Sequence, residues 1–179
     1  MNASDSCSSQ APNSRPTIPP SPAARVAMVL IGLFALGASI AFYVQANVGA
    51  DPFTVLALGI SNRTGATVGV ATQLVGAGLL VLLLVADRSH IGIGTLLNAV
   101  LVGGSADIVL RFAPRPVSLL STVAMTAAAI LMMGVGVGLY VSGGLGEGAL
   151  EGVMLVLSDR LRIPVRLSRI CMDVAAVLA

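Results

Sequence analysis

The sequence predicts an all-α, polytopic membrane protein, and three observations support this prediction. Of its 179 residues, 56% are hydrophobic and only 10% are charged, whereas about a quarter of the residues in soluble domains are charged. Several apolar runs are about 20 residues long, which is the length that a helix needs to cross a bilayer. The sequence also repeats itself at a spacing of 97 residues. We therefore expect two three-helix repeats, each with a short broken or re-entrant helix, the second repeat being truncated.

The charged residues are few and favour no nucleic-acid partner. All ten basic residues are Arg, and the formal net charge is +2. These Arg residues flank hydrophobic runs, where positive charge sets the orientation of a membrane protein. Cys7 lies in a polar segment and Cys171 in an apolar run, so the pair suggests neither a disulfide nor a metal site. We expect no cofactor and no metal.

The N-terminal residues 1–24 are expected to form a disordered cytoplasmic tail. They are rich in Ser, Pro, Ala and Asn, a composition that buries too little apolar surface to fold. The first repeat then covers residues 25–112 and the second covers residues 117–179. Within them, the apolar runs predict membrane spans at 24–46, 67–86, 91–110 and 117–141, and the start of a fifth span at 165–179.

Two segments interrupt these spans, and the first is the more distinctive. Residues 52–61 are about 10 residues, which give about 15 Å of helix, half the hydrocarbon thickness. Asp51 suits a helix N-cap and Pro52 suits the first helical position. Asn62 and Gly65 suit the end of the same helix. The second interrupted region covers residues 143–164.

The internal repeat appears when the sequence is aligned with itself at the 97-residue shift. Polar residues match at this shift without a gap. Apolar matches alone would not be convincing evidence of a repeat in so hydrophobic a chain. The matched pairs include Tyr43 with Tyr140, Ser61 with Ser158 and Arg63 with Arg160. Ala179 then corresponds to Leu82, while the first repeat continues to about Phe112. The second repeat is therefore expected to be incomplete, either because the chain is truncated or because the protein is naturally short.

Broken helices at membrane depth must be buried in protein or line a wet cavity, because lipid offers no hydrogen-bond partners. Two breaks at matching places predict a site at the interface of the repeats, as in secondary transporters. The alternative is that each short helix is an amphipathic connector at the membrane surface. Glu147 and Glu151 lie four residues apart near the second break. They are candidates for binding a cation or relaying protons, and helix capping is the competing interpretation.

The topology follows from whether the short helices cross the membrane. If they do not cross, each repeat has three spans and the repeats are inverted, with Arg63, Arg111 and Arg115 outside. If they do cross, the repeats are parallel and Arg88 alone lies outside. The distribution of Arg favours the parallel arrangement, whereas the length of the segments favours the inverted one. We adopt the inverted arrangement.

Polar residues inside the spans have simpler expected roles. Asp107 and Arg111, four residues apart, are expected to form a structural ion pair at the end of a helix. Gln73 and Asn98 are expected to hydrogen-bond neighbouring helices. No G-x-S-x-G, H-E-x-x-H or Walker motif is present. We therefore do not expect an enzyme, and no catalytic residue is assigned.

Four motifs carry a family resemblance, at 49–54 (GADPFT), 61–65 (SNRTG), 92–98 (GIGTLLN) and 146–152 (GEGALEG). With them, the chain from about residue 24 onward resembles the YczE-like branch of the YitT-type bacterial integral membrane proteins. The resemblance implies a multi-pass protein of the bacterial plasma membrane. That family places an acid two residues after the motif proline. Thr54 stands there in the first repeat, whereas Glu151 keeps the acid in the second.

Further positions agree with this family pattern or depart from it. Ala149 replaces the second motif proline and Leu150 replaces the usual Arg, which argues against an anion site built on that Arg. The residues that match the pattern as they stand are Asn62, Arg63, Thr95, Asn98 and Asp107.

Taken together, these features predict a small-solute transporter with its site at the interface of the two repeats. A non-transporting membrane scaffold or regulatory partner protein is the alternative. The expected partners are the lipid bilayer and an unknown small solute, with a homo-oligomer or a membrane-protein partner left open. The expected pathway residues are Asp51, Thr54, Asn62, Arg63, Asn98, Glu147, Glu151 and Arg160.

Overall fold

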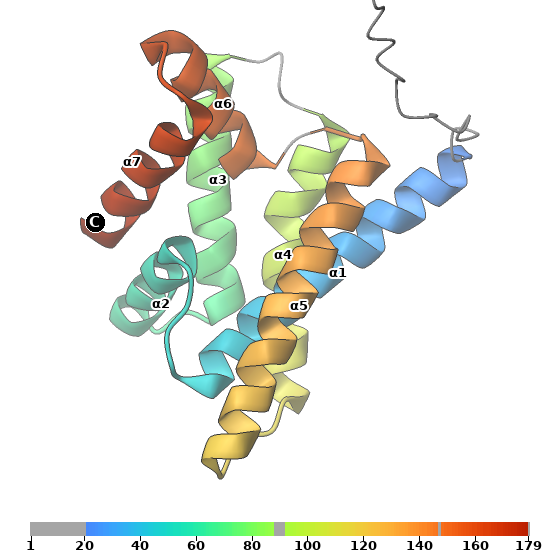
Figure 1. Ribbon diagram of the computed structural model, residues 1–179, viewed down its shortest axis with the longest axis vertical. Coiled ribbons are helices and arrows are strands. Elements are labelled where there is room, and N and C mark those ends of the chain that lie inside the picture. The colour runs from blue at the N-terminus through green and yellow to red at the C-terminus, as the bar shows by residue number, and fades with distance from the viewer. Residues whose placement is uncertain (1–20, 88–91, 147, 179) are drawn as a thin grey trace, which may run out of the picture.

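The computed structural model describes residues 21–87, 92–146 and 148–178 and is all-α in this part, as predicted. Four helices are long: α1 (Pro22–Ala46), α3 (Val68–Ala86), α4 (Ile93–Phe112) and α5 (Leu119–Gly143). Three are shorter: α2 (Pro52–Thr64), α6 (Ala149–Leu161) and α7 (Val165–Leu178) (Figure 1). Most of the expected N-terminal tail lies outside the described residues.

The four long helices are the candidate membrane spans, since each is long and apolar enough to cross a bilayer. Their described ends differ from the predicted ends by at most two residues, and side-chain caps fix where α1, α3 and α5 begin. The Ser21 hydroxyl accepts a hydrogen bond from the Ala24 N–H (3.3 Å), so α1 begins at Pro22. The Ser118 hydroxyl accepts from the Ser121 N–H (3.2 Å), so α5 begins at Leu119 and not at residue 117.

The short helices α2 and α6 each contain 13 residues. At about 1.5 Å per residue they are too short to cross a hydrocarbon core of about 30 Å. Each packs against both α3 and α7. Helix α2 continues three residues past the predicted end at residue 61, because Gly65 supplies the left-handed C-cap (φ 71°) and donates its N–H to the Ser61 carbonyl (2.9 Å). The two short helices therefore lie beside the long helix α3, as Figure 1 shows.

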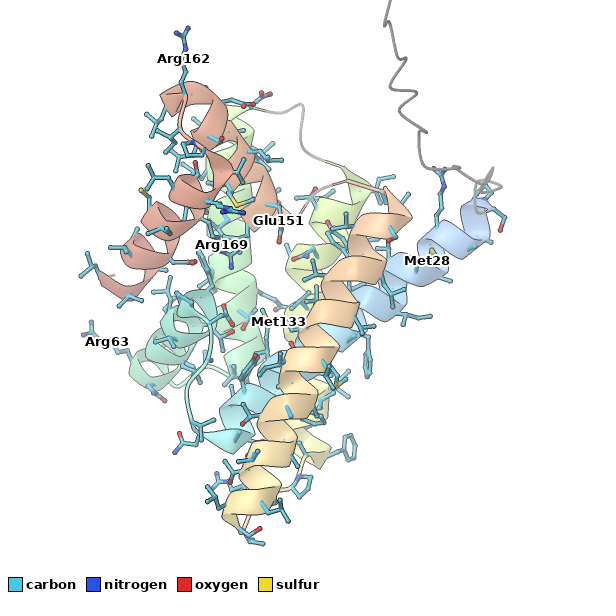
Figure 2. The ribbon with its side chains drawn as sticks, in the orientation of Figure 1. Met28, Arg63, Met133, Glu151, Arg162 and Arg169 are labelled. Atoms are coloured by element: carbon cyan, nitrogen blue, oxygen red, sulfur yellow. The ribbon has the colours of Figure 1, made fainter. Side chains whose placement is uncertain are left out.

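Two apolar clusters form the core of the described part. The first joins α1, α4 and α5 through Val29, Leu33, Val102 and Tyr140. The second joins α3, α6 and α7 through Leu83, Val153, Val156 and Met172. Leu33 and Leu83 are fully buried, whereas many other apolar side chains of the long helices are exposed (Figure 2). An apolar exterior around small buried clusters suits a protein that is surrounded by lipid.

Helices α1 and α5 approach each other closely because glycines face each other at their crossing. A Cβ atom added to Gly32 would lie 2.7 Å from the Gly136 carbonyl oxygen and 2.8 Å from the Tyr140 nitrogen. Both are backbone atoms, so neither can move without shifting a helix. Membrane helices reach so short a separation through small residues at their contact. Van der Waals packing, and not the hydrophobic effect, drives the association of such helices.

The substitution Gly32→Ala is expected to lower the stability of the protein by about 1–3 kcal/mol, the usual cost of overpacking. The control is Gly78→Ala in α3, where an added Cβ meets no atom within 4 Å. That control should be neutral or stabilising by up to about 1 kcal/mol, because Ala favours helices over Gly. Thermal unfolding in detergent compares the two variants. Equal stability of both would mean that the α1–α5 crossing is looser than described.

Candidate functional site

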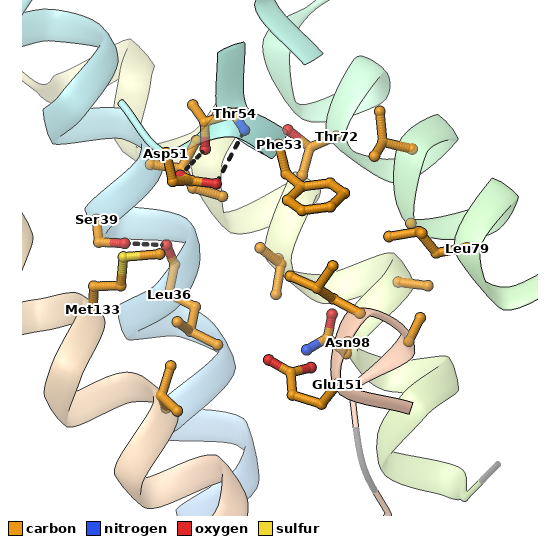
Figure 3. A pocket seen from close by; sticks show the side chains of 18 of the residues that line it. Leu36, Ser39, Asp51, Phe53, Thr54, Thr72, Leu79, Asn98, Met133 and Glu151 are labelled. Atoms are coloured by element: carbon orange, nitrogen blue, oxygen red, sulfur yellow. Dashed lines mark hydrogen bonds between the residues drawn. The ribbon is translucent and has the colours of Figure 1, made fainter. Parts of the chain in front are cut away.

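A cavity of about 270 Å³ lies where the short helices begin, between the long helices. Residues from all seven described helices, or from their caps, line it (Figure 3). Most of the wall is apolar, including Leu36, Phe53, Leu79 and Met133. A mostly apolar wall with a few convergent polar groups is the usual composition of a small-molecule site. The polar side chains are Ser39, Asp51, Thr54, Thr72, Asn98, Glu151 and Arg169.

Asp51 caps α2 at the edge of this cavity. One carboxylate oxygen accepts a hydrogen bond from the Thr54 N–H (3.2 Å), and the other accepts from the Thr54 hydroxyl (2.5 Å). Pro52 follows in the first turn, where its missing N–H costs no hydrogen bond. Thr54 is only 4% exposed. Both oxygens of Asp51 are therefore used to hold the start of α2, which agrees with the predicted capping role.

Glu151 lies in the first turn of α6, close to Asn98 of α4 (Figure 3). The N-cap of α6 is Gly148, which has no side chain to cap the helix. A Cβ atom at Gly148 would clash with the Glu151 carboxylate and would lie 3.5 Å from the Asn98 amide nitrogen. The carboxylate therefore folds back over the helix start, where the positive end of the helix dipole stabilises it. Within the described residues, Glu151 has no hydrogen bond or ion pair.

Among the described residues, Arg169 of α7 is the one basic residue that lines the cavity. Its Nε atom lies 3.2 Å from a carboxylate oxygen of Asp173, one turn later on the same helix. The two side chains are 37% and 30% exposed. A partly exposed pair of this kind contributes little to stability, but it balances the positive charge of Arg169 locally. The acidic groups in and beside the cavity therefore outnumber the basic ones.

The structure brings together Asp51, Thr54, Asn98 and Glu151 at this cavity and leaves other predicted residues elsewhere. Asn62 and Arg63 are exposed near the far end of α2. Arg160 is also exposed, and its Nη2 atom donates to the Ala86 carbonyl oxygen (2.6 Å). The physical reason is that α2 and α6 direct their N-termini toward the cavity, so their last turns lie away from it. Glu147 lies outside the described residues.

The expected ion pair between Asp107 and Arg111 is not formed in the described part of the chain. Asp107 instead accepts hydrogen bonds from the Thr67 hydroxyl (2.5 Å) and the Gly69 N–H (2.7 Å). Its carboxylate thus satisfies donors at the start of α3, while Arg111 stays exposed. The expected interhelical bond of Gln73 is formed, because its Nε2 atom donates to the Val100 carbonyl oxygen (2.8 Å).

Sequence reasoning did not assign Arg169 and Thr72 to the site, although both line the cavity. A signal was present, since Arg169 lies 97 residues after Thr72, at the spacing of the predicted repeat. A polar side chain at either position therefore marks the other as a candidate.

Comparison with protein-family models gives one match, to residues 23–179. The chain belongs to this family, which is described as a family of unknown function (DUF6198). Because the match covers the described helices and the cavity, the fold above is the fold of a DUF6198 domain. No solved structure matches the chain significantly.

Curated relatives are bacterial and distant. The chain is similar to an uncharacterized protein of Haemophilus influenzae, with 26% identity over 153 residues, 86% of this chain and 70% of the relative. It is also similar to the uncharacterized membrane protein YczE of Bacillus subtilis, with 26% identity over 130 residues, 72% of this chain. That match covers 60% of YczE. The resemblance to YczE is thus confirmed as distant homology, whereas the wider YitT-type grouping stays a prediction.

Thr54→Cys and Glu151→Cys, introduced together, are expected to crosslink through short bifunctional thiol reagents in membranes, because both side chains line one cavity. Cys7 and Cys171 are first replaced by Ser to remove the native thiols. The control pairs Thr54→Cys with Arg160→Cys, since Arg160 is exposed away from the cavity. Mobility on a denaturing gel measures the intramolecular bridge. Equal yields for the two pairs, at every reagent length, would contradict the described cavity.

Proposed function

We propose that this DUF6198 protein is a small-solute transporter of the bacterial plasma membrane, with its site between two internal repeats. The single observation that carries the proposal is the cavity at which both short helices begin. Glu151 and Asn98 on one side and Thr54 on the other line this cavity, whose walls are mostly apolar (Figure 3). Broken helices whose N-termini converge on a central cavity are the usual construction of a secondary-transporter site.

Helix bounds support the repeat, with residues 25–112 as the first copy and 117–179 as the second. Helices α5, α6 and α7 begin 97 residues after α1, α2 and α3, respectively. The lengths agree too, at 25 residues for α1 and α5 and 13 residues for α2 and α6.

The turns support the repeat as well. The Ser61 hydroxyl donates to the Ala66 carbonyl oxygen, and the Ser158 hydroxyl donates to the Ile163 carbonyl oxygen, both at 2.7 Å. The left-handed C-cap of α2 at Gly65 has its equivalent at Arg162 after α6. A left-handed Arg is uncommon, so the same turn recurs although the residue does not favour it.

Helix contacts support a pseudo-two-fold relation between the copies. Helix α2 packs against α3 and α7, and α6 packs against α7 and α3, so exchanging the copies leaves these contacts unchanged. Helix α1 packs against α5, its own counterpart. The two run in opposite directions in Figure 1, which favours inverted repeats whose short helices do not cross the membrane.

The charge of the cavity favours a small cationic or zwitterionic solute. Asp51 and Glu151 line it, and Asp173 offsets the charge of Arg169. Asp51 is committed to capping α2. Glu151 is therefore the group we assign to contact the positive part of the solute, with Asn98 as the adjacent hydrogen-bonding group. In an apolar surrounding such a charge pair is stronger than in water.

Transport is tested in proteoliposomes by electrometry on solid-supported membranes, with a panel of small cations, zwitterions and anions. At least one cation or zwitterion should give a transient current, and Glu151→Gln should reduce it by about tenfold or more, since a hydrogen bond to a charged group contributes about 1.5–3 kcal/mol. Asp159→Asn is the control, because Asp159 is an exposed acid on the same helix. A folded protein that gives no current with the whole panel would instead favour the scaffold role.

Topology gives an independent prediction. If the repeats are inverted, Arg63 and Arg160 lie on opposite sides of the membrane although they occupy equivalent positions. Both are exposed in the structure. Arg63→Cys should therefore react with a membrane-impermeant maleimide on intact cells, and Arg160→Cys should react only after permeabilisation. Equal labelling of the two sites on intact cells would mean parallel repeats with crossing short helices.

A further inference from the structure

One face of α5 and α7 carries apolar and glycine residues that no described part of the chain covers. We define the uncovered face by Ile130, Gly134 and Gly138 of α5 with Ile170 of α7. Ile130 is 57% exposed and Ile170 is 56% exposed. A Cβ atom added at Gly134 or Gly138 would meet nothing within 4 Å. Two glycines spaced four residues apart, with space beside them, allow a second helix to approach closely.

The equivalent face of the first repeat is covered by α4. Leu33, Gly37 and Ala41 are the residues 97 positions before Ile130, Gly134 and Gly138, and all three are buried. A Cβ atom on Gly37 would clash with the Ser105 hydroxyl and would lie 2.5 Å from the Val102 carbonyl oxygen, both on α4. One helix therefore fills the glycine groove of α1, whereas the matching groove of α5 is open.

Helix α4 also covers α3, and the matching position on α7 is exposed. Gln73 of α3 donates to the backbone of α4, and the residue 97 positions later is the exposed Ile170. Helix α4 thus lies against both α1 and α3. The corresponding place beside α5 and α7 has the same two walls but no helix in the described part of the chain.

The cavity points to the same place. Its lining contains equivalent residues from both repeats: Leu36 with Met133, Ile40 with Val137, Phe53 with Leu150, Thr54 with Glu151, and Thr72 with Arg169. Helix α4 contributes Asn98, Ala99 and Val102, and these three have no equivalents among the lining residues. The uncovered face adjoins Met133 and Val137, so a helix seated there would complete the cavity wall.

We propose that the uncovered face is the seat of one more membrane-spanning helix, with the pattern of α4. This pattern is an apolar span that presents small residues, as Ser105 and Ala106 do, to the glycines of its neighbour. The proposal rests on the repeat but not on transport.

The occupant is not a second copy of this chain presenting its own α4, because in each copy α4 already lies between α1 and α3. Lipid is also a poor match, since it gains nothing from the close approach that paired glycines allow, whereas helix interfaces are enriched in them.

The test uses a synthetic peptide of α4, Ile93–Phe112, with Ser105→Cys and lysines added at both ends. The 179-residue protein, with Cys7→Ser, Cys171→Ser and Gly134→Cys, is placed in nanodiscs with this peptide under mild oxidation. We expect a disulfide-linked adduct with a yield about fivefold or more above the control. The control protein carries Leu74→Cys, a 55% exposed position on α3.

A second variant keeps the test independent of thiol reactivity. The peptide should raise the thermal unfolding midpoint of the otherwise unsubstituted protein and should not raise that of Gly134→Leu, which blocks the groove. Gly134→Leu alone should unfold at the same temperature as the unsubstituted protein or higher, because an added Cβ meets nothing within 4 Å and Leu favours helices over Gly. Adduct yields equal to the control, together with no thermal shift, would overturn the proposal in favour of lipid. Disulfide-linked dimers through Gly134→Cys that exclude the peptide would overturn it in favour of a second copy.

Discussion

This structure depends on one constraint, which is that every buried backbone N–H and C=O group needs a hydrogen-bond partner. In lipid, a helix that stops halfway leaves free N–H groups at its start, and each costs several kcal/mol unless it is satisfied. At α2 the Asp51 carboxylate supplies the partner. At α6 the Glu151 carboxylate folds over a start that Gly148 cannot cap. Both starts face the cavity between the long helices. Asp51 caps α2 by hydrogen bonds, Glu151 lies over the start of α6 without one in the described part of the chain, and both carboxylates become polar groups of the cavity.

Close packing supplies the surrounding frame. The glycine crossing of α1 and α5 brings backbone atoms within reach of each other. Asp107 joins α4 to the start of α3 through Thr67 and Gly69. These contacts use small residues and single hydrogen bonds because water is absent and apolar side chains gain little by leaving lipid. The frame therefore fixes the position of each short helix without a large apolar core.

Much of this arrangement could be predicted from local chemistry. Asp51-Pro52 predicted the start of α2, and the apolar runs predicted the spans, because caps and length act over a few residues. Tertiary direction could not be predicted in this way. Asn62, Arg63 and Arg160 stay predicted pathway residues, but they are not among the residues that line the cavity, because a short helix presents only one end to it. Asp107 was paired with Arg111 on spacing alone, whereas the backbone N–H of Gly69 is the better partner once α3 lies beside α4.

Thr54 and Glu151 lie 97 residues apart and line one cavity, yet only one of them is an acid. The two short helices have the same length, but the carboxylates at their starts are used differently. Asp51 uses both carboxylate oxygens to cap α2, whereas the Glu151 carboxylate has no hydrogen bond within the described residues. The electric field inside the cavity therefore has a direction, which is set by the unpaired carboxylate on the α6 side, and low-dielectric walls concentrate it. Two short helices of matching length thus carry an electrostatic bias that identical charges at both starts would remove.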